Sequence, residues 1–199
     1  MTKQLKTLAK RAENYWSKRD LQALVQLFHS NGANQVPQVA YFCGLAFHAL
    51  NERRKAIECW RSAIKLRSNY VEPVRALAYE FEAQGQLTEA AKLFYDLIKL
   101  SAASADDLTT LGEICIKQDR MSEAQQWLNQ ALDLDGNNSL ALLALATLYV
   151  HVQDQALALK YLRRAAETRD VDLSDLASDP EFELLWHDSE FEQVISGRH

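Results

Sequence analysis

The apolar residues of the chain recur at helical spacing over most of its length. Ile57, Trp60 and Ile64 are three and four residues apart, and Leu93 and Leu97 repeat this spacing further along. Steps of three and four residues place side chains on one face of an α-helix, whereas the apolar residues of a half-buried strand alternate with polar ones. The 199 residues include only three Pro and six Gly, too few for the many turns of a β-sandwich. The pattern predicts an all-α protein.

Small residues recur at a constant interval of 34 positions. One series is Ala56, Ala90, Ala124 and Ala158, and a second is Gly44, Ala78, Gly112 and Ala146. Four residues after each alanine of the first series comes a large side chain, in turn Trp60, Phe94, Leu128 and Leu162. A fixed period of this length is typical of a repeated supersecondary unit. We expect the small residue of a first helix to let a second helix approach closely, and the large residue to fill the space beside it.

This period and these residues resemble the tetratricopeptide repeat (TPR) family over about two-thirds of the chain. The resemblance implies a right-handed α-solenoid of antiparallel helix pairs. It predicts four tandem repeats, at 37–70, 71–104, 105–138 and 139–170. Thr88 and Ser122 are the expected N-caps of the second helices of two repeats, because a hydroxyl oxygen accepts from the free N–H groups of a first turn.

Both flanks of the predicted array are less regular. Residues 1–36 are expected to form a degenerate N-terminal helix pair, which is a candidate fifth repeat. Residues 171–199 are expected to form an acidic C-terminal capping segment with two short helices, starting at Asp179 and Asp188 and each burying a Phe. The last repeat of a solenoid exposes an apolar side that needs a cover. Docking on that side is the favoured role of the tail, and contact with a basic partner is the alternative.

In the family, the first helices of successive repeats line a concave groove that binds the partner. Carried over by position, the resemblance implies a partner-binding groove of mixed aromatic, acidic and apolar residues: Tyr41, Leu45, His48, Glu72, Arg75, Tyr79, Glu82, Thr109, Glu113, Ile116, Leu143, Thr147, Val150 and His151. Such a surface suits a segment with some basic and some hydrophobic residues.

Chaperone-binding members of the family hold a C-terminal carboxylate with Lys, Asn and Arg in the groove. The corresponding positions of this chain carry Tyr41, Leu45, Ala76, Asp106 and Thr110. These residues lack the required cations, so recognition of an acidic chaperone C-terminus is not expected.

The charge of the chain is unevenly placed. The formal net charge is −5, with basic residues crowded before position 20 and acidic residues predominating from Asp170 onward. An acidic protein lacks the basic surface that a phosphate backbone needs, so no nucleic-acid partner is expected. The start has no apolar run of the secretory type, and no segment reaches about 18 apolar residues, so we expect a cytoplasmic protein without membrane insertion.

Candidate chemistry is sparse. The three cysteines, Cys43, Cys59 and Cys115, contain no CxxC pair, so reduced and buried thiols are expected. The histidines have no metal-site spacing, and no nucleophile elbow or phosphate-binding loop is present. The sequence predicts no enzyme activity, no metal and no cofactor.

The sequence therefore favours a non-catalytic protein-interaction module, an adaptor, scaffold or assembly factor that binds a partner peptide or helix in the concave groove. The alternative is an escort chaperone for a secreted or complex-forming client. An uncovered apolar edge at the end of the array would also favour a homodimer.

Overall fold

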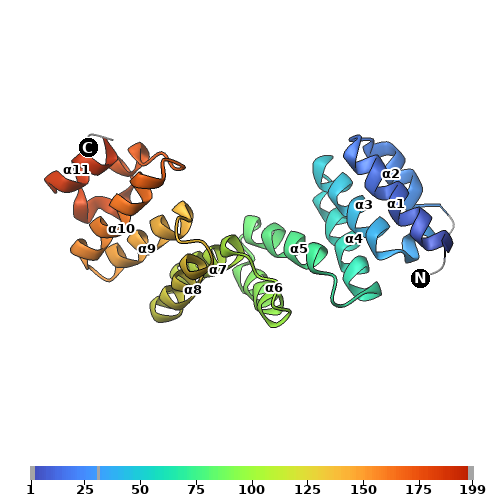
Figure 1. The fold of residues 1–199 in the computed structure, drawn as a ribbon, viewed down its shortest axis with the longest axis horizontal. Coiled ribbons are helices and arrows are strands. Elements are labelled where there is room, and N and C mark those ends of the chain that lie inside the picture. The colour runs from blue at the N-terminus through green and yellow to red at the C-terminus, as the bar shows by residue number, and fades with distance from the viewer. Residues whose placement is uncertain (1–2, 31, 197–199) are drawn as a thin grey trace. The chain divides into compact units, whose positions relative to one another are not determined.

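A computed structural model describes residues 3–30 and 32–196, and within these ranges the chain forms helices and no strand (Figure 1). The elements fall into two compact units, Met1–Ala102 and Ala103–His199. The N-terminal unit contains α1 (Lys3–Ser17), α2 (Leu21–Phe28), the short 3₁₀ helix η1 (Ala33–Gln35), α3 (Pro37–Ala49), α4 (Arg53–Leu66), α5 (Val71–Ala83) and α6 (Leu87–Lys99). The C-terminal unit contains α7 (Ala105–Lys117), α8 (Met121–Leu134), α9 (Ser139–His151), α10 (Gln155–Thr168), the 3₁₀ helices η2 (Ser174–Ala177) and η3 (Pro180–Leu185), and α11 (Ser189–Ile195).

Consecutive helices pack as pairs. In the N-terminal unit α3 packs against α4 and α5 against α6, while both α1 and α2 lie on α3. In the C-terminal unit α7 packs against α8 and α9 against α10. The fold is therefore all-α and built from helix pairs, as the spacing of apolar residues predicts.

The same tight turn closes the first helix of each pair. Asn51, Gly85, Asp119 and Gln153 lie 34 residues apart and all have a positive φ, between 57° and 71°. In each case the next residue donates its backbone N–H to the carbonyl oxygen five residues earlier, as Glu52 does to Phe47 at 2.8 Å. This left-handed residue with a 6→1 hydrogen bond satisfies the free carbonyls of a helix end. Arg19, with φ 54°, makes the same turn between α1 and α2.

The expected N-caps are wrong. The turn delivers the chain directly into the second helix, so α6 begins at Leu87 after Gln86 and α8 begins at Met121 after Arg120. Thr88 and Ser122 consequently lie inside the first turn and cap neither helix. Side-chain caps occur elsewhere, as at Ser104, which forms a capping box with Asp107 before α7.

The small residues of both series are buried between paired helices. Every alanine from Ala56 to Ala158 in the first series is fully buried, and the large residue that follows each by four positions is also buried. The glycines of the second series face those large residues, Gly44 against Trp60 and Gly112 against Leu128. The close approach predicted from the 34-residue period is present in the structure.

The C-terminal segment folds back onto the last helix pair. Phe182 and Phe191 are buried with ring centroids 6.3 Å apart, and Trp186 Nε1 donates to the carbonyl oxygen of Leu176 at 3.3 Å. η3 lies on α9, and α11 lies on α10, where Arg163 Nε is 2.9 Å from Glu190 Oε1. The tail thus docks on its own body.

Candidate partner-binding groove

The first pocket that contains predicted groove residues lies in the N-terminal unit and measures about 600 Å³. α1 contributes one wall, α3 a second, and the connection into α5 a third. Its lining combines aromatic rings with charged side chains: Lys6, Ala9, Lys10, Glu13, Gln38, Tyr41, Phe42, Arg67, Tyr70 and Glu72. The predicted residues Tyr41 and Glu72 therefore share one pocket with residues of α1 that the repeat period did not single out.

Two tyrosines form the aromatic floor of this pocket. Tyr41 meets Tyr70 edge-on with centroids 5.5 Å apart, and the Arg67 guanidinium lies 3.7 Å from the centre of the Tyr70 ring. Burial raises the pKa of both phenols, and the nearby Glu72 carboxylate raises each further. Both hydroxyls therefore stay neutral and can donate or accept hydrogen bonds at physiological pH.

The Gln38 side chain lines the same pocket, but its amide oxygen is covered by the protein. Gln38 Oε1 is buried, and no donor for it exists among residues 3–30 and 32–196. A buried polar atom that lacks a hydrogen bond costs about 1–3 kcal/mol.

The other predicted residues of the N-terminal unit are already engaged to different degrees. Arg75 donates to the carbonyl oxygen of Ala102 at 2.6 Å, and the Tyr79 ring meets Phe94 edge-on at 5.3 Å. His48 Nε2 lies 3.2 Å from the buried carboxylate of Glu80. Leu45 and Glu82 are half-buried on α3 and α5.

The Glu80 carboxylate ties three helices together. It accepts from Gln84 Nε2 at 2.6 Å and from Arg53 at 3.5 Å in addition to its contact with His48. Charged groups are rarely buried unless they are paired in this way. We therefore assign His48 a structural contact, although half of its side chain remains exposed.

The second pocket that contains predicted residues lies in the C-terminal unit and measures about 270 Å³. α7 and α9 supply the predicted residues, and the C-terminal segment supplies the rest of the wall. Its lining is Glu113, Ile116, Lys117, Leu143, Ala144, Thr147, Leu176, Asp179, Glu181 and Phe182. The 34-residue period does not predict that the C-terminal segment lines this pocket.

Three predicted residues of the C-terminal unit offer little surface. Thr109, Ile116 and Val150 are buried, and the Thr109 hydroxyl donates to the carbonyl oxygen of Ala105 at 2.9 Å. Of the three, Ile116 borders the pocket. His151 is exposed in the last turn of α9.

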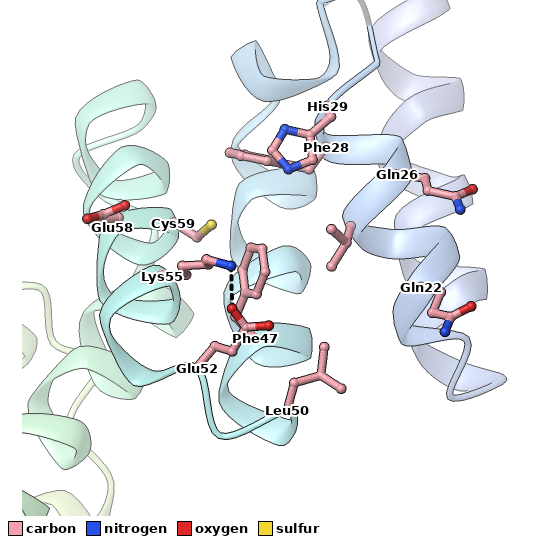
Figure 2. A pocket seen from close by; sticks show the side chains of 11 residues that line it. Gln22, Gln26, Phe28, His29, Phe47, Leu50, Glu52, Lys55, Glu58 and Cys59 are labelled. Atoms are coloured by element: carbon pink, nitrogen blue, oxygen red, sulfur yellow. Dashed lines mark ion pairs between the residues drawn. The ribbon is translucent and has the colours of Figure 1, made fainter.

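A further pocket, of about 640 Å³, lies between the second helices α2 and α4 (Figure 2). Phe28 on α2, Phe47 on α3 and Cys59 on α4 form its apolar lining, and Lys55 pairs with Glu52 at its edge. The sequence analysis missed this pocket because the resemblance to the TPR family implies binding residues on the first helices only. No sequence signal distinguishes it, because the exposure of Leu50 in its lining is visible only in the structure.

The two units carry opposite charge. Residues 1–102 contain 15 Lys and Arg against 9 Asp and Glu, whereas residues 103–199 contain 7 against 18. Charge of one sign on a surface attracts segments of the opposite sign and speeds their association. The pocket of the C-terminal unit is therefore set in an acidic surrounding.

Two features of other functional classes are absent from residues 3–30 and 32–196. No cluster of three or more His, Cys, Asp or Glu residues suited to a metal ion occurs there. None of the described helices combines the length and apolar character needed to cross a membrane.

Comparison with known proteins yields one family. Residues 82–148 match the family model described as tetratricopeptide repeat. Among solved structures, "MamA 41-end from Desulfovibrio magneticus RS-1" aligns with a TM-score of 0.73 at 16% identity over 85% of this chain and 97% of that chain. YrrB, described as a TPR protein with an unusual peptide-binding site, aligns with a TM-score of 0.69 at 14% identity over 89% of this chain and 91% of that chain. No curated protein matches the sequence.

Proposed function

We propose that this chain is a tetratricopeptide repeat protein, that it acts as a non-catalytic adaptor, scaffold or assembly factor of the cytoplasm, and that its first helices bind a segment of a partner protein. The repeats are those at 37–70, 71–104, 105–138 and 139–170. The pair α1 and α2 acts as a further repeat, since it closes with the same left-handed turn at Arg19.

The pocket of the N-terminal unit is the observation that carries this proposal. Its half-buried Tyr41 ring, held edge-on against the buried Tyr70, gives a partner a rigid aromatic contact at low cost in side-chain entropy. The Gln38 amide, which lines the same pocket, adds a polar group. Apolar contact with a few fixed polar groups is the general composition of a specific binding site.

Two walls of this pocket carry charges of both signs. Lys6, Lys10 and Glu13 line the wall formed by α1, and Arg67 and Glu72 line the connection into α5. A partner segment with both acidic and basic residues beside an apolar anchor would match this lining. YrrB supports peptide binding as a use of this fold, since it is described as having a peptide-binding site.

The proposal is tested with a partner identified by affinity purification and mass spectrometry, followed by calorimetry on purified proteins. The variant Gln38→Ala with Tyr41→Ala should weaken binding at least about tenfold, the loss expected for removal of a hot spot. Circular dichroism should show unchanged helix content.

A control removes an amide and a large apolar side chain from the other pocket of the N-terminal unit. The variant Gln22→Ala with Leu50→Ala alters the lining between α2 and α4 and should leave the affinity unchanged. The opposite outcome, loss of binding in the control alone, would move the site to that pocket and overturn the proposal.

A further inference from the structure

The C-terminal segment completes a pocket as well as covering the last helix pair. Leu176, Asp179, Glu181 and Phe182 form one wall of the 270 Å³ pocket, opposite residues of α7 and α9. We call this the tail-walled pocket. Its volume lies just below the range of about 300–1,000 Å³ that encloses a whole small-molecule ligand, so it accommodates a single long side chain of a larger partner.

The lining of the tail-walled pocket is apolar at its base. Phe182 and Ala144 are buried there, and Leu143 is half-buried beside them. This base offers contact to methylene groups, since apolar area removed from water contributes about 25 cal/mol per Å².

The polar lining is predominantly anionic. Glu113, Asp179 and Glu181 contribute carboxylates, and among the described lining residues Lys117 is the single cation. The Glu181 side chain is exposed, whereas Asp179 Oδ1 accepts from the backbone N–H of Glu181 at 3.0 Å. An incoming cation therefore meets an excess of negative charge, which the acidic composition of residues 103–199 increases.

We propose that the tail-walled pocket binds one arginine or lysine side chain of the partner segment. Such a side chain lays its methylene stem along an apolar base while its charged head reaches carboxylates. Arginine fits best, because its planar guanidinium donates to carboxylates in pairs. This inference rests on the proposed function, and it adds that the C-terminal segment takes part in selecting the partner.

The test titrates the full chain with three capped peptides of the form Ala-Leu-Xaa-Leu-Ala, in which Xaa is arginine, norleucine or glutamate. Binding is followed by the backbone amide signals in nuclear magnetic resonance spectra. The arginine peptide should shift the amide signals of Leu143, Ala144 and Phe182 and bind more tightly than the norleucine peptide. The glutamate peptide should bind most weakly.

Variants separate the role of the pocket carboxylate from general charge. Glu181→Gln should weaken the arginine peptide about two- to fivefold, as expected for loss of an exposed ion pair, and leave the norleucine peptide unchanged. Glu183→Gln removes the same charge from the same 3₁₀ helix outside the pocket lining and should change neither affinity.

Three results would overturn the inference: equal binding of the arginine and norleucine peptides, equal effects of the two variants, or no shift at the pocket signals. The peptides require no identified partner, so this measurement is independent of the calorimetric one. Loss of the inference with a preserved effect of Gln38 and Tyr41 would leave the proposed function in place.

Discussion

Gly112 in α7 lies so close to Leu128 in α8 that a Cβ atom on Gly112 would stand 2.6 Å from both Cγ and Cδ2 of Leu128. A contact below 3.0 Å forces one of the groups to move. Leu128 is itself fully buried, so it has little room to move.

Replacement of this glycine should therefore destabilise the C-terminal unit. We expect Gly112→Val to lower the free energy of unfolding by about 1–3 kcal/mol, the usual cost of overpacking a core. The gain in helix propensity on removing a glycine, up to about 1 kcal/mol, offsets only part of this. Urea unfolding monitored by circular dichroism measures the change.

Gly136 provides the control for this prediction. A Cβ there would meet only the carbonyl oxygen of Leu132 at 3.7 Å, an ordinary contact, and the residue is exposed. Gly136→Ala should stay within about 0.5 kcal/mol of the parent. Equal losses in the two variants would show that space beside Leu128 is not the cause.

The helix pairs were predictable because their determinants are local and repeated. The spacing of Ala56, Ala90, Ala124 and Ala158 fixes which residues face a neighbouring helix, and the structure buries all four. The N-caps were mispredicted because a hydroxyl near a helix start is a weak signal. At Thr88 and Ser122 the register is set by the left-handed turn before the helix.

The pockets were less predictable than the helices. Repeat position places Tyr41 and Glu72 in the first-helix groove, but exposure depends on what packs over a residue, as the burial of Thr109 and Val150 illustrates. Phe182 reaches a pocket wall because the chain folds back after α10. This segment follows the predicted repeats, so their period says nothing about where it packs. The groove assignment as a whole stays a prediction.

The docked tail leads to a prediction about stability. The Phe182 side chain is 1% exposed and stacks on Phe191. We expect Phe182→Ala to lower the free energy of unfolding by about 3–5 kcal/mol, because it deletes a buried aromatic side chain and leaves a cavity. Urea unfolding again provides the measurement.

Leu184 lies in the same 3₁₀ helix and is 42% exposed, so Leu184→Ala tests a large-to-small change without a buried cavity. It should cost much less than Phe182→Ala. Similar small effects for both would indicate that the tail detaches before the helices of the C-terminal unit unfold.

Cys115 links stability to alkaline pH. Burial raises the pKa of its thiol to about 11, with Glu123 adding to the shift and Arg120 opposing it. In an unfolded chain the pKa of a cysteine thiol is about 8.5. Because folding favours the neutral thiol, its contribution to stability is fully present below the unfolded pKa and is lost as the pH rises through about 11.

Comparison with Cys115→Ala isolates this effect from the titration of other groups. The variant should be less stable than the parent at pH 8, because Cys115 is fully buried, and the difference in free energy of unfolding should shrink as the pH is raised toward 11. Urea unfolding midpoints at pH 8, 9.5 and 11 give the trend. A constant difference across these values would contradict the assigned shift, since only the parent carries the thiol that loses its proton.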